Sequence, residues 1–189
     1  MKMSQVEATS SRSNPSPRTW APPPVGFYKI NTDGSWIDIN NDGAGGVLRC
    51  HKRKWQIGFS MRLNTVGPVS AVLLAIREGL STAWERQIRF VQLEIDAKAL
   101  KYMLENPTRY MDDKLAAIIG DISKLLAKEW VVNILHVKRT GNKIAHGLAN
   151  LGRRLPEDSD TVYHFYSPSS LTEVYMKELT TSMDMLNVG

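Results

Sequence analysis

The chain has little cysteine and no long apolar run. Its single cysteine, Cys50, excludes an internal disulfide and fits a reducing compartment. No apolar stretch approaches the roughly 20 residues that span a bilayer, and the segment MKMSQVEATSSRSNPSP lacks the apolar centre of a secretory signal. We therefore expect an intracellular protein without a membrane partner, in either the nucleus or the cytoplasm.

Acidic residues are fewer than basic ones. The chain has 19 Asp and Glu against 24 Lys and Arg, which gives a net charge of +5 and a pI near 9.3. A positive balance fits contact with a polyanion such as nucleic acid, although many basic proteins bind none. With 189 residues, 42% of them hydrophobic, the chain is long enough for one domain with a core and two tails.

The two ends of the chain differ in composition from its middle. Residues 1–25 are rich in Ser, Pro and Arg and have little to bury, so we expect a disordered basic arm. The basic residues of that arm (Lys2, Arg12 and Arg18) could touch phosphate or could simply be solvated. Residues 26–155 carry the periodic patterns of a folded domain. Residues 156–189 form a tail, with one helix expected over 171–186, that is open to a protein partner.

The first part of the domain has the pattern of three strands joined by short turns. Tyr28, Ile30 and Thr32 alternate with polar residues, which is the period of a strand, and the runs 45–50 and 55–62 are also strand-like. A turn is expected at residues 40–43. The glycine-rich stretch 43–46 is interpreted as part of this turn rather than as a phosphate-binding loop, because no helix follows it. The pattern predicts an antiparallel meander.

The rest of the domain alternates helices with strands. Residues 69–84 have helical spacing, with Ser70 as a candidate N-cap. Further helices are expected at 97–105, after Asp112 or Asp113, and at 142–154, with strands at 89–95 and 130–137. The order βββαβααβα predicts an α/β fold with a five-stranded mixed sheet and helices packed on it. The first three strands are expected to be antiparallel and the last two parallel.

Two aspartates end predicted strands, each on the more polar face. If the strands of Asp33 and Asp96 were parallel neighbours, their backbones would lie about 4.8 Å apart. The carboxylates would then meet at the carboxyl edge of the sheet, where α/β folds often place their sites. Two close anions need a proton or a cation, and Mg²⁺ prefers carboxylate oxygen. Each aspartate alone is also typical of a turn or a helix cap, so the pattern by itself leaves both interpretations open.

Four short motifs follow one another on the expected elements. NTDGS closes the first strand, GAGGVLR lies in the second, EIDAKAL closes the fourth, and HVKRTGNKIAHGLANLG covers the last strand and helix. Over about residues 26–152 the chain resembles the ribonuclease H-like domains that are common in plant genomes and related to retroelement polyproteins. The resemblance implies the ribonuclease H fold. In that family four carboxylates hold two Mg²⁺ ions that cut the RNA strand of an RNA–DNA hybrid, and Asp33 and Asp96 match two of the four.

The other two positions depart from the family pattern. Val72 stands where the first helix of the family has a Glu, and His146 stands where the last helix has an Asp. Two carboxylates supply about −2 against the roughly +4 of two Mg²⁺ ions, and an imidazole suits transition metals better than Mg²⁺. We therefore expect at most one weakly bound Mg²⁺ or Mn²⁺, and cleavage that is lost or reduced. Val72 also fits an apolar helix stripe, and His146 also fits a solvated helix face.

Other carboxylates are not expected to complete the set. Glu94 shares a strand face with Asp96 but lies about 6.6 Å back along the strand. Glu78 lies about 9 Å along its helix from Val72. Asp38 and Asp42 belong to an expected loop.

Binding needs the metal ions less than cleavage does, because hybrids are recognised through backbone and 2′-hydroxyl contacts. The residues expected to contact nucleic acid flank the predicted site: Gly34, Ser35, Lys138, Arg139, Asn142 and Lys143. Their basic members are also typical of ordinary solvated surface. Three functions stay open. They are a module that binds RNA–DNA hybrid or structured RNA with impaired catalysis, an active Mg²⁺- or Mn²⁺-dependent ribonuclease H, and a domesticated module for protein contacts through residues 156–189.

Overall fold

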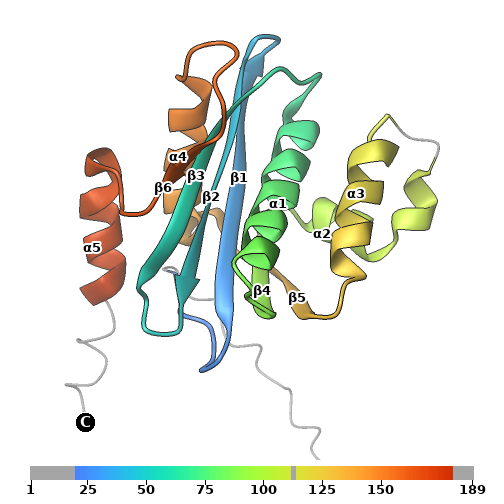
Figure 1. Ribbon diagram of the computed structural model, residues 1–189. Coiled ribbons are helices and arrows are strands. Elements are labelled where there is room, and N and C mark those ends of the chain that lie inside the picture. The colour runs from blue at the N-terminus through green and yellow to red at the C-terminus, as the bar shows by residue number, and fades with distance from the viewer. Residues whose placement is uncertain (1–19, 112–113, 181–189) are drawn as a thin grey trace, which may run out of the picture.

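A mixed sheet lies at the centre of the molecule (Figure 1). The computed structural model describes residues 20–111 and 114–180, and within them the strands follow the order β5-β4-β1-β2-β3-β6. β1, β2 and β3 pair antiparallel, whereas β4 runs parallel to both β1 and β5. The predicted α/β class and the two halves of the sheet are confirmed. The strands are β1 (Tyr28–Asp38), β2 (Asn41–Cys50), β3 (Trp55–Leu63), β4 (Phe90–Ile95), β5 (Val131–His136) and β6 (Val162–His164).

The prediction of five strands is wrong, because the described residues form six. β6 pairs antiparallel with β3, with Ser60 opposite Val162 and Gly58 opposite His164. It comes from the segment expected to be a tail, where a strand of 3 residues is too short to show an alternating pattern. β6 covers part of the edge that β3 would otherwise expose.

Helices cover both faces of the sheet. A Cβ on Gly79 of α1 would meet Ile30 and Thr32 of β1, whereas His146 of α4 meets Asp33. Because successive side chains of a strand point to opposite faces, β1 lies between α1 and α4. The helices are α1 (Pro68–Glu85), α2 (Lys98–Glu105), α3 (Ala116–Leu126), α4 (Lys143–Arg153) and α5 (Thr172–Thr180), with short 3₁₀ turns η1 (Pro107–Tyr110), η2 (Arg139–Gly141) and η3 (Ser169–Leu171). Within the described part of the chain, no helix is long and apolar enough to cross a bilayer.

The main core lies between the sheet, α1 and α3. As the helical spacing predicts, α1 contributes Leu73, Ile76 and Leu80, and all three side chains are fully buried. Burying one such aliphatic side chain stabilises a fold by roughly 1.5–3 kcal/mol. A smaller cluster under α4 and the η3–α5 segment consists of Val47, Ile144, Leu148 and Leu171. It attaches the C-terminal segment to the domain.

Two glycines allow helices to approach the sheet closely. A Cβ on Gly34 would lie 2.7 Å from the backbone nitrogen of Val72 in α1, and a Cβ on Gly45 would overlap the backbone of α4.

The turn between β1 and β2 lies earlier than predicted. Residues 43–46 lie inside β2, so the prediction of a turn there is wrong. The turn falls at residues 39–40, where Asn40 has a φ of 69°, a conformation that Asn adopts more readily than most residues.

The first strand is longer than predicted. β1 continues to Asp38, so Asp33 lies within the strand instead of at its end, and Asp42 lies in β2 instead of a loop. The extension follows from pairing, because β2 supplies Gly45 opposite Asp33 and further partners toward the turn. The parallel pairing of β1 with β4, in contrast, ends at Asn31, two residues before Asp33. Asp33 therefore has a strand partner in β2 but none in β4.

The start of α1 also differs from the prediction. Its N-cap residue is Gly67, and Pro68 takes the first turn, where its fixed φ is favourable. Ser70 does not cap the helix, since its hydroxyl donates to the Gly67 carbonyl at 2.8 Å. The caps expected at Asp112 or Asp113 lie outside the described residues.

Six buried polar residues form a connected group on the sheet face that also carries Asp33. Asn31 is its centre: Oδ1 accepts hydrogen bonds from Trp20 Nε1 (2.8 Å) and the Arg49 guanidinium (3.0 Å), and Nδ2 donates to Glu94 (2.7 Å). Lys29 also pairs with Glu94, Arg49 pairs with Glu178, and the Arg49 guanidinium stacks 3.6 Å from the Trp20 ring. Two cations and two carboxylates balance, so each buried charge has a partner. We call this set the Arg49 cluster: Trp20, Lys29, Asn31, Arg49, Glu94 and Glu178.

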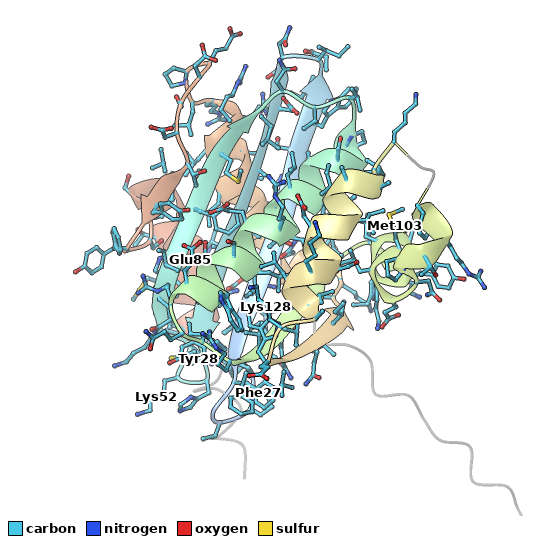
Figure 2. All side chains as sticks on the ribbon, turned by 45° about the vertical axis from the view of Figure 1, so that its right-hand side comes forward. Phe27, Tyr28, Lys52, Glu85, Met103 and Lys128 are labelled. Atoms are coloured by element: carbon cyan, nitrogen blue, oxygen red, sulfur yellow. The ribbon has the colours of Figure 1, made fainter. Side chains whose placement is uncertain are left out.

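The Arg49 cluster fixes both described ends of the chain on the sheet. Trp20 is only 2% exposed, although the sequence predicts a disordered arm as far as residue 25. Glu178 belongs to α5, inside the helix predicted for 171–186, of which the part after Thr180 lies outside the described residues. Figure 2 shows the end of the sheet where β1 begins, with Tyr28 and Phe27 near Lys52 of the β2–β3 turn.

Candidate active site and nucleic-acid interface

Asp33 is a buried carboxylate with a histidine partner. Its side chain comes from β1 and is almost inaccessible, and its Oδ2 lies 2.8 Å from Nδ1 of His146 in α4. Its Oδ1 accepts a hydrogen bond of 2.9 Å from the backbone N–H of Gly34. The structure therefore brings together two of the predicted site positions, Asp33 and His146, from segments more than 100 residues apart.

Asp96 directly follows β4, the neighbouring parallel strand. Asn31 of β1 pairs with Glu94 of β4, so Asp33 and Asp96 each lie two residues beyond that pair, on the same face. The condition on which the sequence argument rested, that these two strands are parallel neighbours, is met. The Asp96 carboxylate lies 3.6 Å from Nε of Arg139 in η2, whose side chain is 83% exposed. Each aspartate thus faces a side-chain nitrogen, that of His146 in α4 for Asp33 and that of Arg139 in η2 for Asp96.

Burial raises the pKa of the Asp33 carboxyl above its usual value. The negative charge of Asp96 raises it further, whereas the hydrogen bond from His146 and that from the Gly34 N–H lower the pKa. The two carboxylates are thus close enough to repel one another. A site of this kind is one where a cation or a hydrogen-bond donor is favourable.

Val72 lies beside Gly34, the residue after Asp33, and its side chain brings no ligand atom. The contact of α1 with Gly34 places the Val72 backbone next to the residue that follows Asp33. Its side chain is half-buried and packs against the main core. Packing against the core therefore explains this residue.

Three of the four acidic residues weighed as substitutes are engaged elsewhere, and the fourth, Asp38, is exposed at the end of β1. Glu94 is bound in the Arg49 cluster. Glu78 accepts a 2.5 Å hydrogen bond from Tyr163, and burial together with Glu78 raises the pKa of that tyrosine to about 12. Asp42 is buried and accepts a 2.8 Å hydrogen bond from the Thr65 N–H.

The donors around Asp33 do not fit a pair of Mg²⁺ ions. Among the residues that the structure describes, no group of three or more His, Cys, Asp and Glu side chains could hold a metal ion. Asp33 and Asp96 supply carboxylate oxygens, which Mg²⁺ prefers, whereas His146 supplies an imidazole nitrogen, which it does not. The two carboxylates together carry about half the negative charge that would balance two divalent ions.

The residues expected to contact nucleic acid fall into two groups. Lys138, Arg139 and Lys143 are exposed: Lys138 precedes η2, Arg139 begins it, and Lys143 begins α4. Ser35 and Asn142, in contrast, are buried and bound inside the fold. The Ser35 hydroxyl donates to Asn150 and accepts from Arg153, and Asn142 Nδ2 donates to the Thr32 carbonyl at 2.9 Å. Gly34 uses its N–H on Asp33.

Asn142 has a structural task that sequence reasoning missed. Its side chain binds the backbone of Thr32, the residue before Asp33, and its carbonyl accepts the hydrogen bond of the His146 N–H at 3.0 Å. It thereby connects the strand of Asp33 to the helix of His146. A polar residue just before a helix gives no sign of such a partner, because Thr32 lies 110 positions away.

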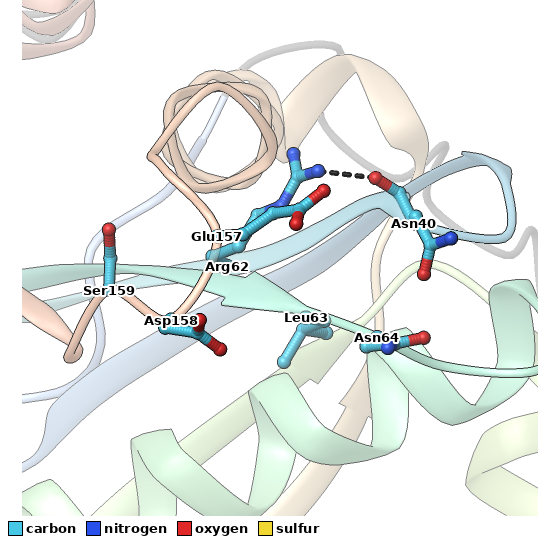
Figure 3. Close-up of a pocket in the computed structure, with 7 residues that line it drawn as sticks. All are labelled: Asn40, Arg62, Leu63, Asn64, Glu157, Asp158 and Ser159. Carbon is cyan, nitrogen blue, oxygen red and sulfur yellow. Dashed lines mark hydrogen bonds between the residues drawn. The ribbon is translucent and has the colours of Figure 1, made fainter.

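A polar hollow of about 220 Å³ lies beside the β1–β2 turn (Figure 3). Arg62, which lines the hollow, donates hydrogen bonds to the backbone carbonyls of Asn40 and Arg153. None of the predicted site residues lines it, so we place the site at Asp33 instead. The lining residues are Asn40, Arg62, Leu63, Asn64, Glu157, Asp158 and Ser159.

Sequence comparison places most of the domain in a known family. Residues 31–152 match the family model described as reverse transcriptase-like. The Arabidopsis thaliana protein named "Putative ribonuclease H protein At1g65750" is 37% identical over 135 residues, which cover 69% of this chain. The matched part is 21% of that relative, so the chain spans about a fifth of its length.

Solved structures share the fold at low sequence identity. Ribonuclease H1 of Halobacterium salinarum matches with a TM-score of 0.62 and 20% identity, over 67% of this chain and 96% of that one. The N-terminal RNase H domain of Rv2228c from Mycobacterium tuberculosis matches with a TM-score of 0.62 and 18% identity, over 67% and 93%. The foamy virus protease-reverse transcriptase in complex with RNA/DNA hybrid matches with a TM-score of 0.57 and 18% identity, over 79% of this chain and 22% of that one.

Proposed function

This chain belongs to the reverse transcriptase-like family and is a ribonuclease H-like domain, and we propose that it binds nucleic acid while cutting it weakly or not at all. The partner is an RNA–DNA hybrid or a structured RNA. The resemblance inferred from the motifs is confirmed at the level of the family.

The contact between His146 and Asp33 carries the proposal. In the family pattern, the position of His146 belongs to a carboxylate, and Asp33 is the first metal ligand. Here an imidazole nitrogen lies 2.8 Å from the Asp33 carboxylate, and Val72 packs into the core where the pattern has a Glu. Two divalent ions would meet two carboxylates instead of four. We infer at most one Mg²⁺ or Mn²⁺, weakly bound at Asp33 and Asp96.

Retained binding is supported by the cations on the same edge of the fold. Lys138 and Lys143 are exposed, and Arg139 projects from η2 between them in the chain. Contacts to phosphate and 2′-hydroxyl groups need such donors and a complementary shape but no metal. Because Ser35 and Asn142 are buried, we assign them to support of the site rather than to contact with nucleic acid.

The test measures binding and cutting separately on one labelled RNA–DNA hybrid. Binding is titrated in EDTA at several salt concentrations, and cleavage is followed with excess protein in Mg²⁺ and in Mn²⁺. We expect salt-dependent binding with little or no cleavage. Cleavage that Asp33→Asn abolishes would instead make the chain an active ribonuclease H. Absence of salt-dependent binding would favour a module for protein contacts.

A further inference from the structure

β5 forms an open edge of the sheet within the described residues, at the opposite side from β6 (Figure 1). The Val131 N–H donates a 2.8 Å hydrogen bond to the Arg89 carbonyl on the β4 side. The Val137 N–H donates in the same way to the Ile95 carbonyl at 3.0 Å. Successive residues of a strand direct their backbone groups to alternate sides. Three residues of β5 therefore direct their N–H and C=O groups away from β4: Val132, Ile134 and His136.

β5 lacks the features that keep an edge strand from pairing. Natural edges are protected by short length, by lysine or proline, or by a bulge. β6, at the other edge, has 3 residues. β5 has 6 residues with the sequence VVNILH, and its register with β4 is unbroken. An edge of this length, without Lys or Pro, is a template for another strand.

The exposed face of β5 is partly apolar. Val131 is 41% exposed, Leu135 is 36% exposed, and Phe90, the β4 partner of Val131, is 51% exposed. These side chains lie on the α4 side of the sheet, since Leu135 is the β5 partner of Glu94 in the Arg49 cluster. α4 itself packs on β1, β2 and β3. A strand added at the β5 edge therefore brings its own side chains against exposed apolar surface.

We propose that the strand at this edge is β5 of a second copy of this chain, antiparallel to the first about a two-fold axis at Ile134. In this register the two copies of Ile134 face each other, and Val132 faces the partner subunit's His136. All three outward residues of each copy then exchange hydrogen bonds with the other, and the sheet continues across the dimer. The inference goes beyond the proposed function, because the pairing of β5 requires no nucleic acid.

Two backbone hydrogen bonds favour this register over its neighbours. With the axis one residue earlier, His136 would have to pair with Trp130, whose N–H already donates to the Lys128 carbonyl at 2.9 Å. With the axis one residue later, Lys138 would have to pair, and its carbonyl already accepts the Gly141 N–H at 2.8 Å. Only the axis at Ile134 uses the outward groups of β5 alone.

The same register brings opposite charges together at both ends of the paired strands. Glu129, before β5, comes opposite Arg139 of the partner subunit, after its β5, and both residues are exposed. Such pairs at a rim add little affinity, but they select the orientation of the partner. A parallel arrangement would instead place Glu129 beside Glu129. The charges at the two ends of β5 thus fit an antiparallel second copy.

The test measures the oligomeric state of the full chain without nucleic acid. In the proposed register Asn133, which is exposed, lies directly opposite Leu135 of the partner subunit. Asn133→Lys/Leu135→Lys therefore places lysine opposite lysine, whereas Asn133→Glu/Leu135→Lys places glutamate opposite lysine. The control Val162→Lys/Tyr166→Lys adds the same charge near the β6 edge, where both residues are exposed. Sedimentation equilibrium is run at about 1–100 µM protein, since interfaces can be as weak as micromolar, and thermal melting establishes that each variant is folded.

We expect the wild type to approach twice the 21.2 kDa mass of one chain as its concentration rises. Asn133→Lys/Leu135→Lys should raise the dissociation constant of the dimer about tenfold or more, because two pairs of like charges face each other directly. Asn133→Glu/Leu135→Lys should dimerise again, and Val162→Lys/Tyr166→Lys should dimerise like the wild type.

A wild-type chain that stays monomeric over the whole range would overturn the inference, and a strand of another protein would then be the candidate for this edge. An unchanged dissociation constant for Asn133→Lys/Leu135→Lys would overturn it as well, since the copies would then meet at another surface. If Asn133→Glu/Leu135→Lys is folded but monomeric, the pairing of Asn133 with Leu135 is wrong.

Discussion

His146 in α4 and Asp33 in β1 lie 2.8 Å apart, nitrogen to oxygen. His146 is half-exposed and Asp33 is buried. The nearby Asp96 faces Arg139 across 3.6 Å. Each of the two aspartates thus has a nitrogen partner from this chain.

Restoring the family ligands should restore cleavage. The double variant Val72→Glu/His146→Asp places four carboxylates around one point, which matches the charge of two divalent ions. We expect Mg²⁺- or Mn²⁺-dependent cutting of a labelled hybrid at least 100-fold faster than the wild type, about the effect of a single catalytic group. Val72→Gln/His146→Asn, with the same shapes and no charge, is the control. Equal rates for the two double variants would contradict the assignment of these positions.

The ion pair between Arg49 and Glu178 should be essential for the stability of the fold. Glu178→Gln leaves a buried guanidinium without its carboxylate and should lower the free energy of unfolding by about 3–5 kcal/mol. The double variant Arg49→Met/Glu178→Met removes both charges and should lose less. Urea unfolding of the three proteins measures this. A loss below about 1 kcal/mol for Glu178→Gln would mean that the pair behaves like one on the surface.

The contact of β2 with α4 should not tolerate a side chain at Gly45. A Cβ there overlaps the backbone of Leu148 and Ala149, so Gly45→Ala must displace the helix that carries His146. We expect a loss of about 1–3 kcal/mol or more. Gly120→Ala is the matched control, because Gly120 lies in α3 with nothing within 4 Å of the added Cβ. That variant should gain roughly 0.5–1 kcal/mol, and a similar response of both variants in urea unfolding would contradict the packing argument.

Stability should fall in mild acid partly through His164. Burial lowers the pKa of His164, which lies in β6 with Nε2 3.0 Å from the Ser60 hydroxyl. Between the lowered pKa and the usual value near 6.5, the unfolded chain binds the proton more readily, so stability drops as the pH falls through that window. His164→Gln should lose less stability than the wild type between pH 7.5 and pH 5. Parallel curves for the two proteins would show that His164 is not the group concerned.

Much of the fold could be predicted from local patterns. Helical spacing identified the buried face of α1, and alternation identified β4, because each pattern repeats over neighbouring residues. β6 was missed because three residues carry no period. The length of β1 was missed because it depends on pairing with the glycines of β2. The motifs located Asp33 and Asp96 through the family resemblance, whereas the strand pattern alone left both a site and a turn or cap open.

The Arg49 cluster could not be predicted, because its members have no relation in sequence. Arg49 and Glu178 are 129 residues apart, and Asn31 and Glu94 are 63 apart. Residues 1–25 were expected to be disordered, yet the Trp20 side chain packs against Arg49 and donates a hydrogen bond to Asn31. Ser35 and Asn142 were assigned to nucleic acid for the same reason, since their partners Asn150 and Thr32 become neighbours only in the fold.

The number of metal ions at Asp33 tests the central claim most directly. Crystals of the protein soaked in Mn²⁺ and measured at the manganese absorption edge would show each bound ion by its anomalous signal. The account predicts one weakly occupied ion at most, between Asp33 and Asp96. Two well-occupied ions about 3.5–4 Å apart beside these carboxylates would contradict it.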